Sequence, residues 1–574
     1  MRIRNLNLLI FAICALFLAG CSSTYYREKA DKEVYGILSQ KELGLFGKTN
    51  EFGIDTKYSQ RDPDDIPAME LIIGRKLDGT NVTLTLNEAI GMAFDRNRTY
   101  QTRKEQLYLT GLTLTLRRWD FAKKPFGAMR GGVERERDKD LKATTGSNRI
   151  GFNQALRSGG TIGLSLANDM VRYFTGDPRR AITTVVSANL SQPLLRGSSA
   201  DIVAENLTQA ERNVIYGLRD FGLFQQTFSV EIVTDYFRLL QRQDAVRNSY
   251  NNYIRLGETV KQAEAFLDAD RMKLIQVDQA KQQRLSGRSS YIRAVQQYQA
   301  QLDEFKKKLE VPIGVHLNID DSSLGDLKDI GLQLVELADR VGYEMAVTNK
   351  LDILNEIDRF EDSKRKIKVA ADSLRANLTL LTGASLQNDA TDYANFDAGD
   401  FKASAGLQLD LPFDRRSQRN TYRTRLIEFE REIRSLSLTL DNARDAVRED
   451  LRELEQLRQN YEIQKESLVL ANQRVAITPD LIEAGRAQIR DLLEAQDAQL
   501  SAQNAVTAVL VDYLAARLKF LVDIGVLNTG GDRWWLKTDE LVATNSTGPI
   551  PGAGADTDNI LTPEQVFDGQ SVQN

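Results

Sequence analysis

The sequence predicts a mainly α-helical protein with a smaller membrane β-barrel portion and an internal two-fold repeat. Three observations lead to this fold class. Long stretches carry apolar residues at helical spacing without interruption, several short stretches alternate strictly between apolar and polar residues, and the same order of elements occurs in both halves of the chain.

The helical pattern is clearest from Leu426 to Leu454, where apolar residues follow one another in steps of three and four. This is the 3.5-residue spacing of a coiled-coil seam. Residues 421–478 contain neither Gly nor Pro, so a continuous helix there would be roughly 85 Å long. Further long helices are expected at 201–266, 271–310 and 487–524, and one opening at Thr85 and running to about Phe121.

The strand pattern has a period of two residues. Four stretches alternate in this way, at 160–169, 181–193, 373–383 and 401–412. Their length suits a barrel that crosses lipid, although a half-buried sheet of a soluble domain alternates in the same way. Residues 148–157 form an additional candidate, so the strands of the first half are less well defined.

The repeat is seen where each strand pair ends. LSQPLLRGSSAD at 190–201 matches LDLPFDRRSQRN at 409–420, and 266–285 align with 481–500, so that Arg271 matches Arg486. Each half therefore has the order strand, strand, long helix, turn, long helix. Two halves give four strands per chain, fewer than the eight that the smallest membrane barrels need, so closure requires several copies.

The N-terminus has the features of a secretory signal. Arg2 and Arg4 precede an apolar run, and residues 18–21 read LAGC. This tetrapeptide resembles the lipobox of bacterial lipoproteins, which implies removal of residues 1–20 and a covalent lipid on Cys21. An ordinary secretory signal with a chance cysteine is the alternative.

The composition argues against most enzymatic and nucleic-acid functions. The chain has two cysteines, one histidine and a formal net charge of −5. After processing only Cys21 remains, so no disulfide, Cys/His zinc site or catalytic triad is expected unless His316 serves. No phosphate-binding loop or large basic block occurs. We therefore expect no catalytic residue, no metal, no cofactor beyond the lipid, and no nucleic-acid partner.

These features together resemble the TolC-like outer-membrane efflux family, over roughly Leu84 to Val526. The matching stretches are EAGRAQIRDLLEAQDAQL, QPLLRG and LPFDRR. The resemblance implies a homotrimer with a twelve-stranded β-barrel, four strands per chain, continuous with a hollow α-barrel. It also implies an exit duct of a tripartite efflux or type I secretion system. The duct would be lipid-anchored in the outer membrane, extend into the periplasm, and work with a periplasmic adaptor and an inner-membrane pump.

The turn between the last two long helices carries the candidate site residues. Asp491 and Glu494 are three residues apart and share a helix face. The resemblance implies that they ring the periplasmic entrance, whereas a solvated helix face is the simpler explanation. It also implies a basic latch residue, which would hold the entrance closed. The family position falls on Ala487, so Arg486 or Arg490 is the candidate here.

The two helix turns are the candidate adaptor contacts, at Asp270, Arg271, Ala484, Gly485 and Arg486. The alternative is that these residues only form turns. Gly485 supplies the backbone freedom that such a turn needs, and Asp270 takes the matching position in the first turn.

The expected organisation is a signal peptide at 1–20, an irregular tether at 21–83, repeats at 84–330 and 331–528, and a disordered tail at 529–574. Two other functions remain open. One is a periplasmic, lipid-anchored coiled-coil structural or adaptor protein, and the other is a cell-wall enzyme that uses Asp491 and Glu494.

Overall fold

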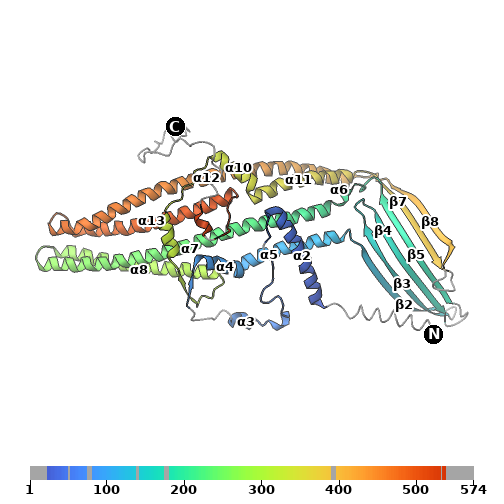
Figure 1. Cartoon of the computed structure of the whole chain (residues 1–574), viewed down its shortest axis with the longest axis horizontal. Helices are drawn as coiled ribbons and strands as arrows, with labels where there is room; N and C mark the ends of the chain where they lie inside the picture. The colour runs from blue at the N-terminus through green and yellow to red at the C-terminus, as the bar shows by residue number, and fades with distance from the viewer. Residues whose placement is uncertain are drawn as a thin grey trace.

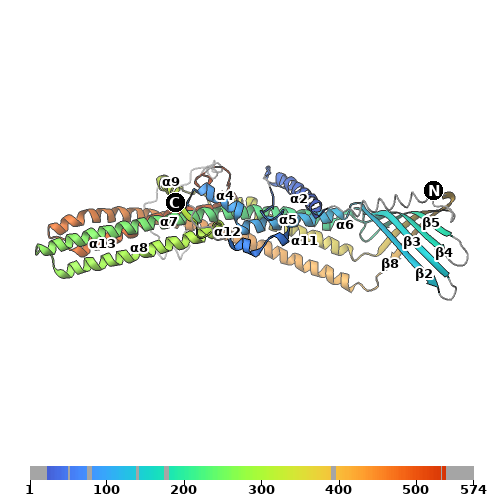
Figure 2. The ribbon, with the colours of Figure 1, turned by 90° about the horizontal axis from the view of Figure 1, so that it is seen from below.

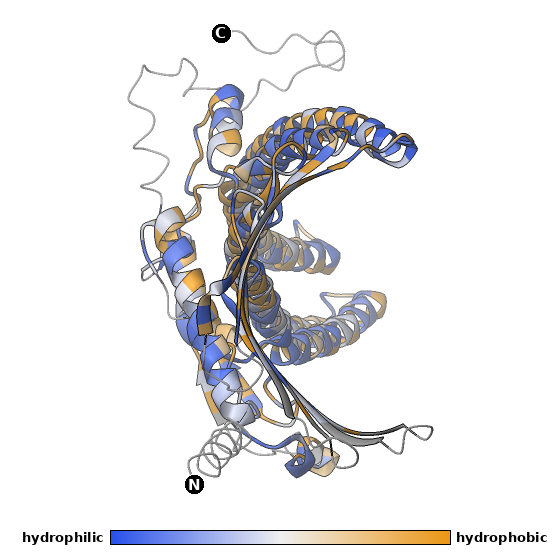
Figure 3. Ribbon diagram, turned by 90° about the vertical axis from the view of Figure 1, so that its right-hand side faces the viewer, coloured by the Kyte–Doolittle hydropathy of each residue, from blue (hydrophilic) through white to orange (hydrophobic). Residues whose placement is uncertain are grey.

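The molecule is elongated, with one β-sheet at one end and long helices that reach the other end (Figures 1 and 2). The computed structural model describes residues 22–49, 52–73, 81–136, 141–173, 180–388, 396–531 and 533–537. Viewed along the long axis, the sheet and the helices follow one arc, and shorter segments lie on its convex side (Figure 3).

The two halves of the chain contain the same four long elements. In the first half these are α4 (Leu86–Arg96), α5 (Arg98–Trp119), α7 (Glu205–Asp268) and α8 (Leu274–Lys308). In the second half they are α10 (Asp339–Asn349), α11 (Leu351–Asp372), α12 (Arg416–Glu483) and α13 (Ile489–Asp523). The predicted long helices and the repeat are therefore present.

The single helix expected from Thr85 to Phe121 is wrong, because the chain breaks it at Asn97. Thr85 and Glu88 form a capping box that starts α4. The side chain of Asn97 then accepts a hydrogen bond from the backbone N–H of Tyr100 and starts α5. A cap residue inside an apolar pattern thus divides one helix into two.

The described strands of the large sheet number six, so the predicted four strands per chain are wrong. Their order is β2-β3-β4-β5-β7-β8, and all neighbours are antiparallel. Their bounds are β2 (Lys124–Glu136), β3 (Leu141–Ala155), β4 (Thr161–Tyr173), β5 (Arg180–Pro193), β7 (Asn377–Asn388) and β8 (Phe396–Asp410). The hairpin β2–β3 has no counterpart in the second half.

The main core lies midway along the helices. A short parallel sheet of β1 (Asn81–Leu84) and β6 (His316–Ile319) packs there, near α9 (Ser322–Ile330). Tyr236 and Phe237 of α7 are fully buried in this core, and so is Phe520 of α13. Trp534 and Trp535, in a short 3-10 helix (Trp534–Leu536), are also buried.

The N-terminal segment is more regular than expected. Residues Ser23–Phe46 form α2, which packs Val34, Ile37 and Leu38 against α5 and α7. Gly111 of α5 allows this close approach, because a Cβ there would lie 2.7 Å from Val34. The remaining described elements are α3 (Ala68–Ile73), α6 (Ala200–Val203) and a 3-10 turn (Pro63–Asp65). None of the helices in the described ranges has the length and apolarity to cross a bilayer.

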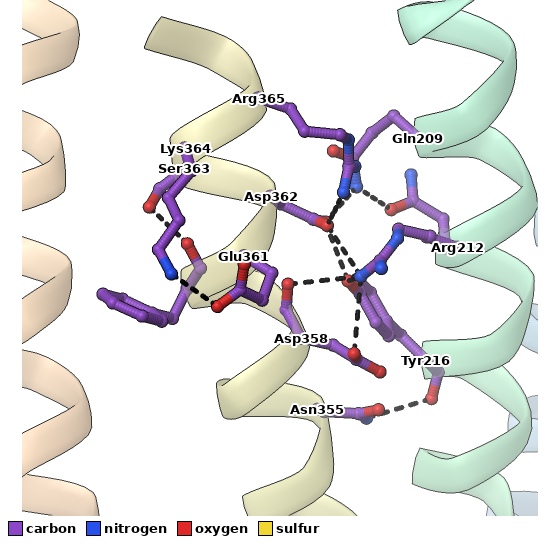
Figure 4. Close-up of polar contacts among 12 residues, drawn as sticks. Gln209, Arg212, Tyr216, Asn355, Asp358, Glu361, Asp362, Ser363, Lys364 and Arg365 are labelled. Carbon is purple, nitrogen blue, oxygen red and sulfur yellow. Dashed lines mark hydrogen bonds and ion pairs between the residues drawn. The ribbon is translucent and has the colours of Figure 1, made fainter.

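A polar network around a buried carboxylate joins α7 of the first half to α11 of the second (Figure 4). Asp362 of α11 is 2% exposed. Its carboxylate pairs with Arg212 of α7 at 3.0 Å and with Arg365 at 2.9 Å. It also accepts hydrogen bonds from Tyr216 at 2.7 Å and from Gln209 at 2.9 Å. We call these five residues the α7–α11 network.

The network places a negative charge where water does not reach it. Burial raises the pKa of Tyr216 to about 12, and the Asp362 carboxylate contributes to the rise. The hydroxyl therefore stays protonated and donates. Because α7 follows β5 and α11 precedes β7, the network fixes how the strands of the two halves enter the sheet.

We expect Asp362→Ala to lower the free energy of unfolding by about 1–3 kcal/mol, since it removes a buried acceptor that four side chains share. The half-buried Arg212 and Arg365 keep only their second partners, Asp358 and Glu205. Thermal unfolding followed by circular dichroism measures the change. Glu361→Ala is the control on the neighbouring position, where the carboxylate pairs with Lys364 at 2.6 Å while 49% exposed. Its expected effect is below about 1 kcal/mol. Equal effects of the two substitutions would contradict a special role for the network.

Candidate functional site

Over two neighbouring rows, the sheet carries apolar side chains on one face and polar or small ones on the other. One row of paired residues runs through five strands and is entirely apolar, and the next row on the same face is also apolar. The first row is Ile150, Leu166, Val186, Leu386 and Phe401, and the second is Phe152, Leu164, Ala188, Ala384 and Ala403. Because side chains alternate along each strand, the rows between these point to the opposite face.

The opposite face is polar, and we assign it to the concave side of the arc because a hollow lies against it. Its rows are Gly151, Ser165, Ser187, Ser385 and Lys402, and Asn153, Gly163, Asn189, Gly383 and Ser404. Ser165 and Ser187 share a hydrogen bond of 2.8 Å. The second polar row lines a hollow of about 760 Å³ together with Lys124 and Asp120. The sheet thus presents polar groups inward and apolar groups outward.

The helices continue this polar lining. A second hollow, of about 690 Å³, is lined by α5, α7, α11 and α12. Its polar residues come from all four helices and include Thr110, Thr113, Gln209, Asn213, Asp220, Lys366, Glu428 and Glu432. Hollows with polar residues in their lining therefore lie along both the sheet and the helical part.

At the end far from the sheet, the turns α7–α8 and α12–α13 have the same backbone structure. Asp270 has φ 56° and Gly485 has φ 71°, the left-handed conformation expected for both. Arg271 N–H donates to Phe266 O at 2.8 Å, and Arg486 N–H donates to Leu481 O at 2.8 Å. Each turn is thus a Schellman motif, which satisfies the last carbonyls of its helix.

The two tips are packed together. Their shared core consists of buried residues from α7, α8 and α13: Leu256, Val260, Ala263, Val277, Ala280, Ile489, Leu492 and Leu493. Within it, Gln496 donates to the Thr259 hydroxyl at 3.0 Å. The hairpins therefore form one four-helix end rather than two independent tips.

A side-chain contact also joins the tips. Arg271 of the first tip donates a hydrogen bond of 2.9 Å to the backbone O of Glu483, the last residue of α12. Its guanidinium lies 5.4 Å from the centre of the Phe266 ring. A cation at the C-terminal end of a helix interacts favourably with its exposed carbonyls.

Solved structures of outer-membrane channels share this architecture. CusC, described as forming a transmembrane channel, matches with a TM-score of 0.55 and 12% identity over 77% of this chain and 92% of its own. The outer-membrane protein VceC of Vibrio cholerae matches with a TM-score of 0.55 and 14% identity over 77% and 96%. The chain has a TolC-like fold. The CmeC outer-membrane channel of Campylobacter jejuni gives the same TM-score, at 14% identity over 77% and 85%.

Searches with the sequence alone gave no matching family model and no matching curated protein. The TolC-like fold therefore rests on the three-dimensional arrangement. The neighbours are described as channels, which agrees with the prediction that the chain is not an enzyme. In the described part of the chain, no group of three or more His, Cys, Asp or Glu is placed to hold a metal ion.

In this TolC-like chain the predicted acidic pair has partners within its own tip. Asp491 accepts a hydrogen bond of 2.9 Å from the Gln488 N–H and so caps α13. Glu494 lies 3.5 Å from Arg474 of α12, with both side chains at least half exposed. In the first tip the aligned Gln276 makes the same cap, to Lys273 N–H at 3.2 Å. A neutral residue can therefore cap, and the charge of Asp491 is not needed for that purpose.

The structure assigns the tip-to-tip contact to Arg271, whereas the sequence suggested Arg486 or Arg490 as the latch. Both of those arginines are exposed, and neither side chain has a hydrogen bond or ion pair to another described residue. No sequence signal distinguishes Arg271 from Arg486, since they occupy the same turn position. The two differ only in their surroundings, because Arg271 lies beside the C-terminal end of α12.

The proposed adaptor-contact residues Asp270, Arg271, Ala484, Gly485 and Arg486 are all exposed at the end of the molecule. Cys21 and the signal peptide lie outside the described residues, as does the tail beyond 537. Their assignments stay predictions.

We expect Arg271→Ala to loosen the two tips, because it removes a bond worth about 1 kcal/mol. Such a loss would raise the population of a separated state about five-fold. Single-channel recording in planar bilayers would show this as a larger open probability. Arg486→Ala is the matched control at the same position of the other turn and should leave the recording unchanged. A larger response to Arg486→Ala would contradict the assignment.

We also expect the double change Asp491→Asn with Glu494→Gln to reduce cation preference in the same recordings. The caps should survive, since Gln276 already shows that an amide suffices. Asp441→Asn with Asp445→Asn, two exposed acids on α12, is the control for loss of charge elsewhere. An unchanged preference for cations in the tip variant would remove the acidic pair from the entrance.

Proposed function

We propose that three copies of the chain form an outer-membrane exit duct of a tripartite efflux or type I secretion system. The duct passes substrates delivered by an inner-membrane pump and a periplasmic adaptor to the outside. The TolC-like fold supports a channel role in efflux, since CmeC, which shares the fold, is described as an outer-membrane channel.

The observation that carries the proposal is the segregation of the two sheet faces. Convex side chains such as Leu164 and Leu166 are 42% and 38% exposed, although they are apolar. Exposed apolar rows that continue in register across five strands suit contact with lipid. The concave rows of Ser, Asn and Gly suit contact with water. A sheet of this kind is the wall of a water-filled pore.

The helices supply the reach across the periplasm. The 68 residues of α12 correspond to about 100 Å at the usual helical rise. The hollow on this part has polar residues in its lining, as the hollow on the sheet does. The tips at its end are exposed and are proposed to contact the adaptor.

The lipid on Cys21 is proposed as a second attachment to the outer membrane. The described chain starts at Ser22, whose hydroxyl accepts a hydrogen bond from the Tyr25 N–H and caps α2. Because α2 packs beside α5 and α7, a lipid on the preceding residue would be held close to the outside of the tube.

Arginine substitutions on the two faces of β4 test the proposal. We expect Leu164→Arg to prevent assembly in the outer membrane, since a charge on a lipid-facing strand costs about 2–4 kcal/mol in each copy. Ser165→Arg, the matched control on the concave face, should assemble and alter ion selectivity. Membrane fractionation and bilayer conductance measure both results.

Assembly of both variants, or of neither, would contradict the assignment of the faces. A soluble, single-chain product after Cys21→Ser, with no conductance steps, would favour the periplasmic coiled-coil protein instead.

A further inference from the structure

Two long strand edges stay open within one chain. β2 and β8 are the ends of the large sheet, and each has one hydrogen-bonded neighbour in the described part of the chain. They contain 13 and 15 residues. Six strands are too few to close a membrane barrel, and unpaired backbone groups are costly in hydrocarbon. Each edge therefore needs a strand of similar length.

The directions of the two edge strands allow them to pair with each other in neighbouring copies. β2 leaves the helical part after α5, and β8 returns to it before α12. Within the sheet every neighbouring pair is antiparallel. A junction between β8 of one copy and β2 of the next continues this alternation around the ring.

The register of the sheet determines which residues would meet. A row of partners that starts at Lys124 of β2 passes through Asn153, Gly163, Asn189 and Gly383 and ends at Ser404 of β8. Ser404 lies six residues before Asp410, where β8 ends at the helices. Because strands in a barrel are staggered, the helix-proximal Lys124 of the next copy would lie opposite Asp410.

This register matches both faces. Lys124 and Asp410 lie on the concave face and carry opposite charges. On the convex face, apolar or small residues of β2 meet those of β8: Pro125 with Leu409, Gly127 with Leu407, Met129 with Ala405, and Val133 with Phe401. If the register between β2 and β8 were shifted by one residue, polar residues of one strand would lie opposite apolar residues of the other.

We infer that β8 of each copy pairs with β2 of the next, so that three six-stranded chains close an eighteen-stranded barrel. The inference rests on the proposed trimeric duct and specifies which strands of neighbouring copies pair with each other. The hairpin β2–β3 is then the junction between subunits. Because barrel diameter grows about linearly with strand number, the outer opening would be about 1.5 times as wide as in a twelve-stranded barrel.

Cysteine cross-linking tests the junction in the full-length protein. Ala128→Cys in β2 and Gly406→Cys in β8 are opposite one another in this register and lie on the concave face. An added Cβ at Gly406 meets no atom within 4 Å, so the substitution fits. After oxidation in outer membranes we expect a ladder of covalent products that ends at three copies.

The controls separate register, strand order and copy number. Each single-cysteine variant should give no ladder, which also excludes Cys21 as the source. In the variant with Ala128→Cys and Lys402→Cys, the second cysteine lies four residues, about 13 Å, from the position opposite the first. This pair should react poorly. A ladder from Ser165→Cys with Gly406→Cys would overturn the inference, because β4 would then be the edge and the ring would hold twelve strands. A ladder that ends at two copies would overturn it as well.

Counting strands in an image of the unmodified complex by electron cryo-microscopy gives a second test. A ring of eighteen supports the inference, and a ring of twelve overturns it. If the complex conducts ions, the proposed duct stands, whether the ring has twelve strands or eighteen. Absence of conductance together with a single-chain product would overturn the duct itself.

Discussion

Backbone hydrogen bonding at the sheet edges is the constraint on which the rest of the molecule depends. A single chain supplies a curved sheet with an apolar convex face, but leaves β2 and β8 without partners on their outer sides. In lipid such edges are costly, whereas a closed ring has none. The even number of strands per chain keeps every junction antiparallel. In the proposed duct, the polar concave rows, the arc of the helices and the two-fold repeat would all belong to a wall that several copies complete.

The two halves of the chain match in their helices but not in their strands. α4 and α10 each have 11 residues, and α5 and α11 each have 22, so the helices of the two halves match closely. The sheet does not match, because the first half contributes the extra hairpin β2–β3. A hairpin begins and ends at the same level of the sheet, so it adds width without displacing a helix. The wall can therefore widen at one end while the helical arrangement stays the same.

The sequence predicted the features that depend on local pattern. The coiled-coil spacing located α7 and α12 closely, and alternation located β4, β5, β7 and β8. Part of β3 was already a candidate at 148–157, through Ile150 and Phe152. β2 was missed because Gly127, Gly131 and Gly132 weaken its alternation. At the tips, the left-handed Asp270 was predicted from its match to Gly485. The contact of Arg271 with α12 was not, since it depends on tertiary packing.

The two tips show how identical backbones can carry different chemistry. Both turns are Schellman motifs followed by a capping box, and the cap is made by Gln276 in one and by Asp491 in the other. Glu494 adds a second acid where the aligned residue is Gln279. Because folding is satisfied by the neutral version, the acids of the second tip are free to serve electrostatics. In a trimer, Asp491 and Glu494 would each be present in three copies, and their negative potential would concentrate where the second hairpins approach the axis.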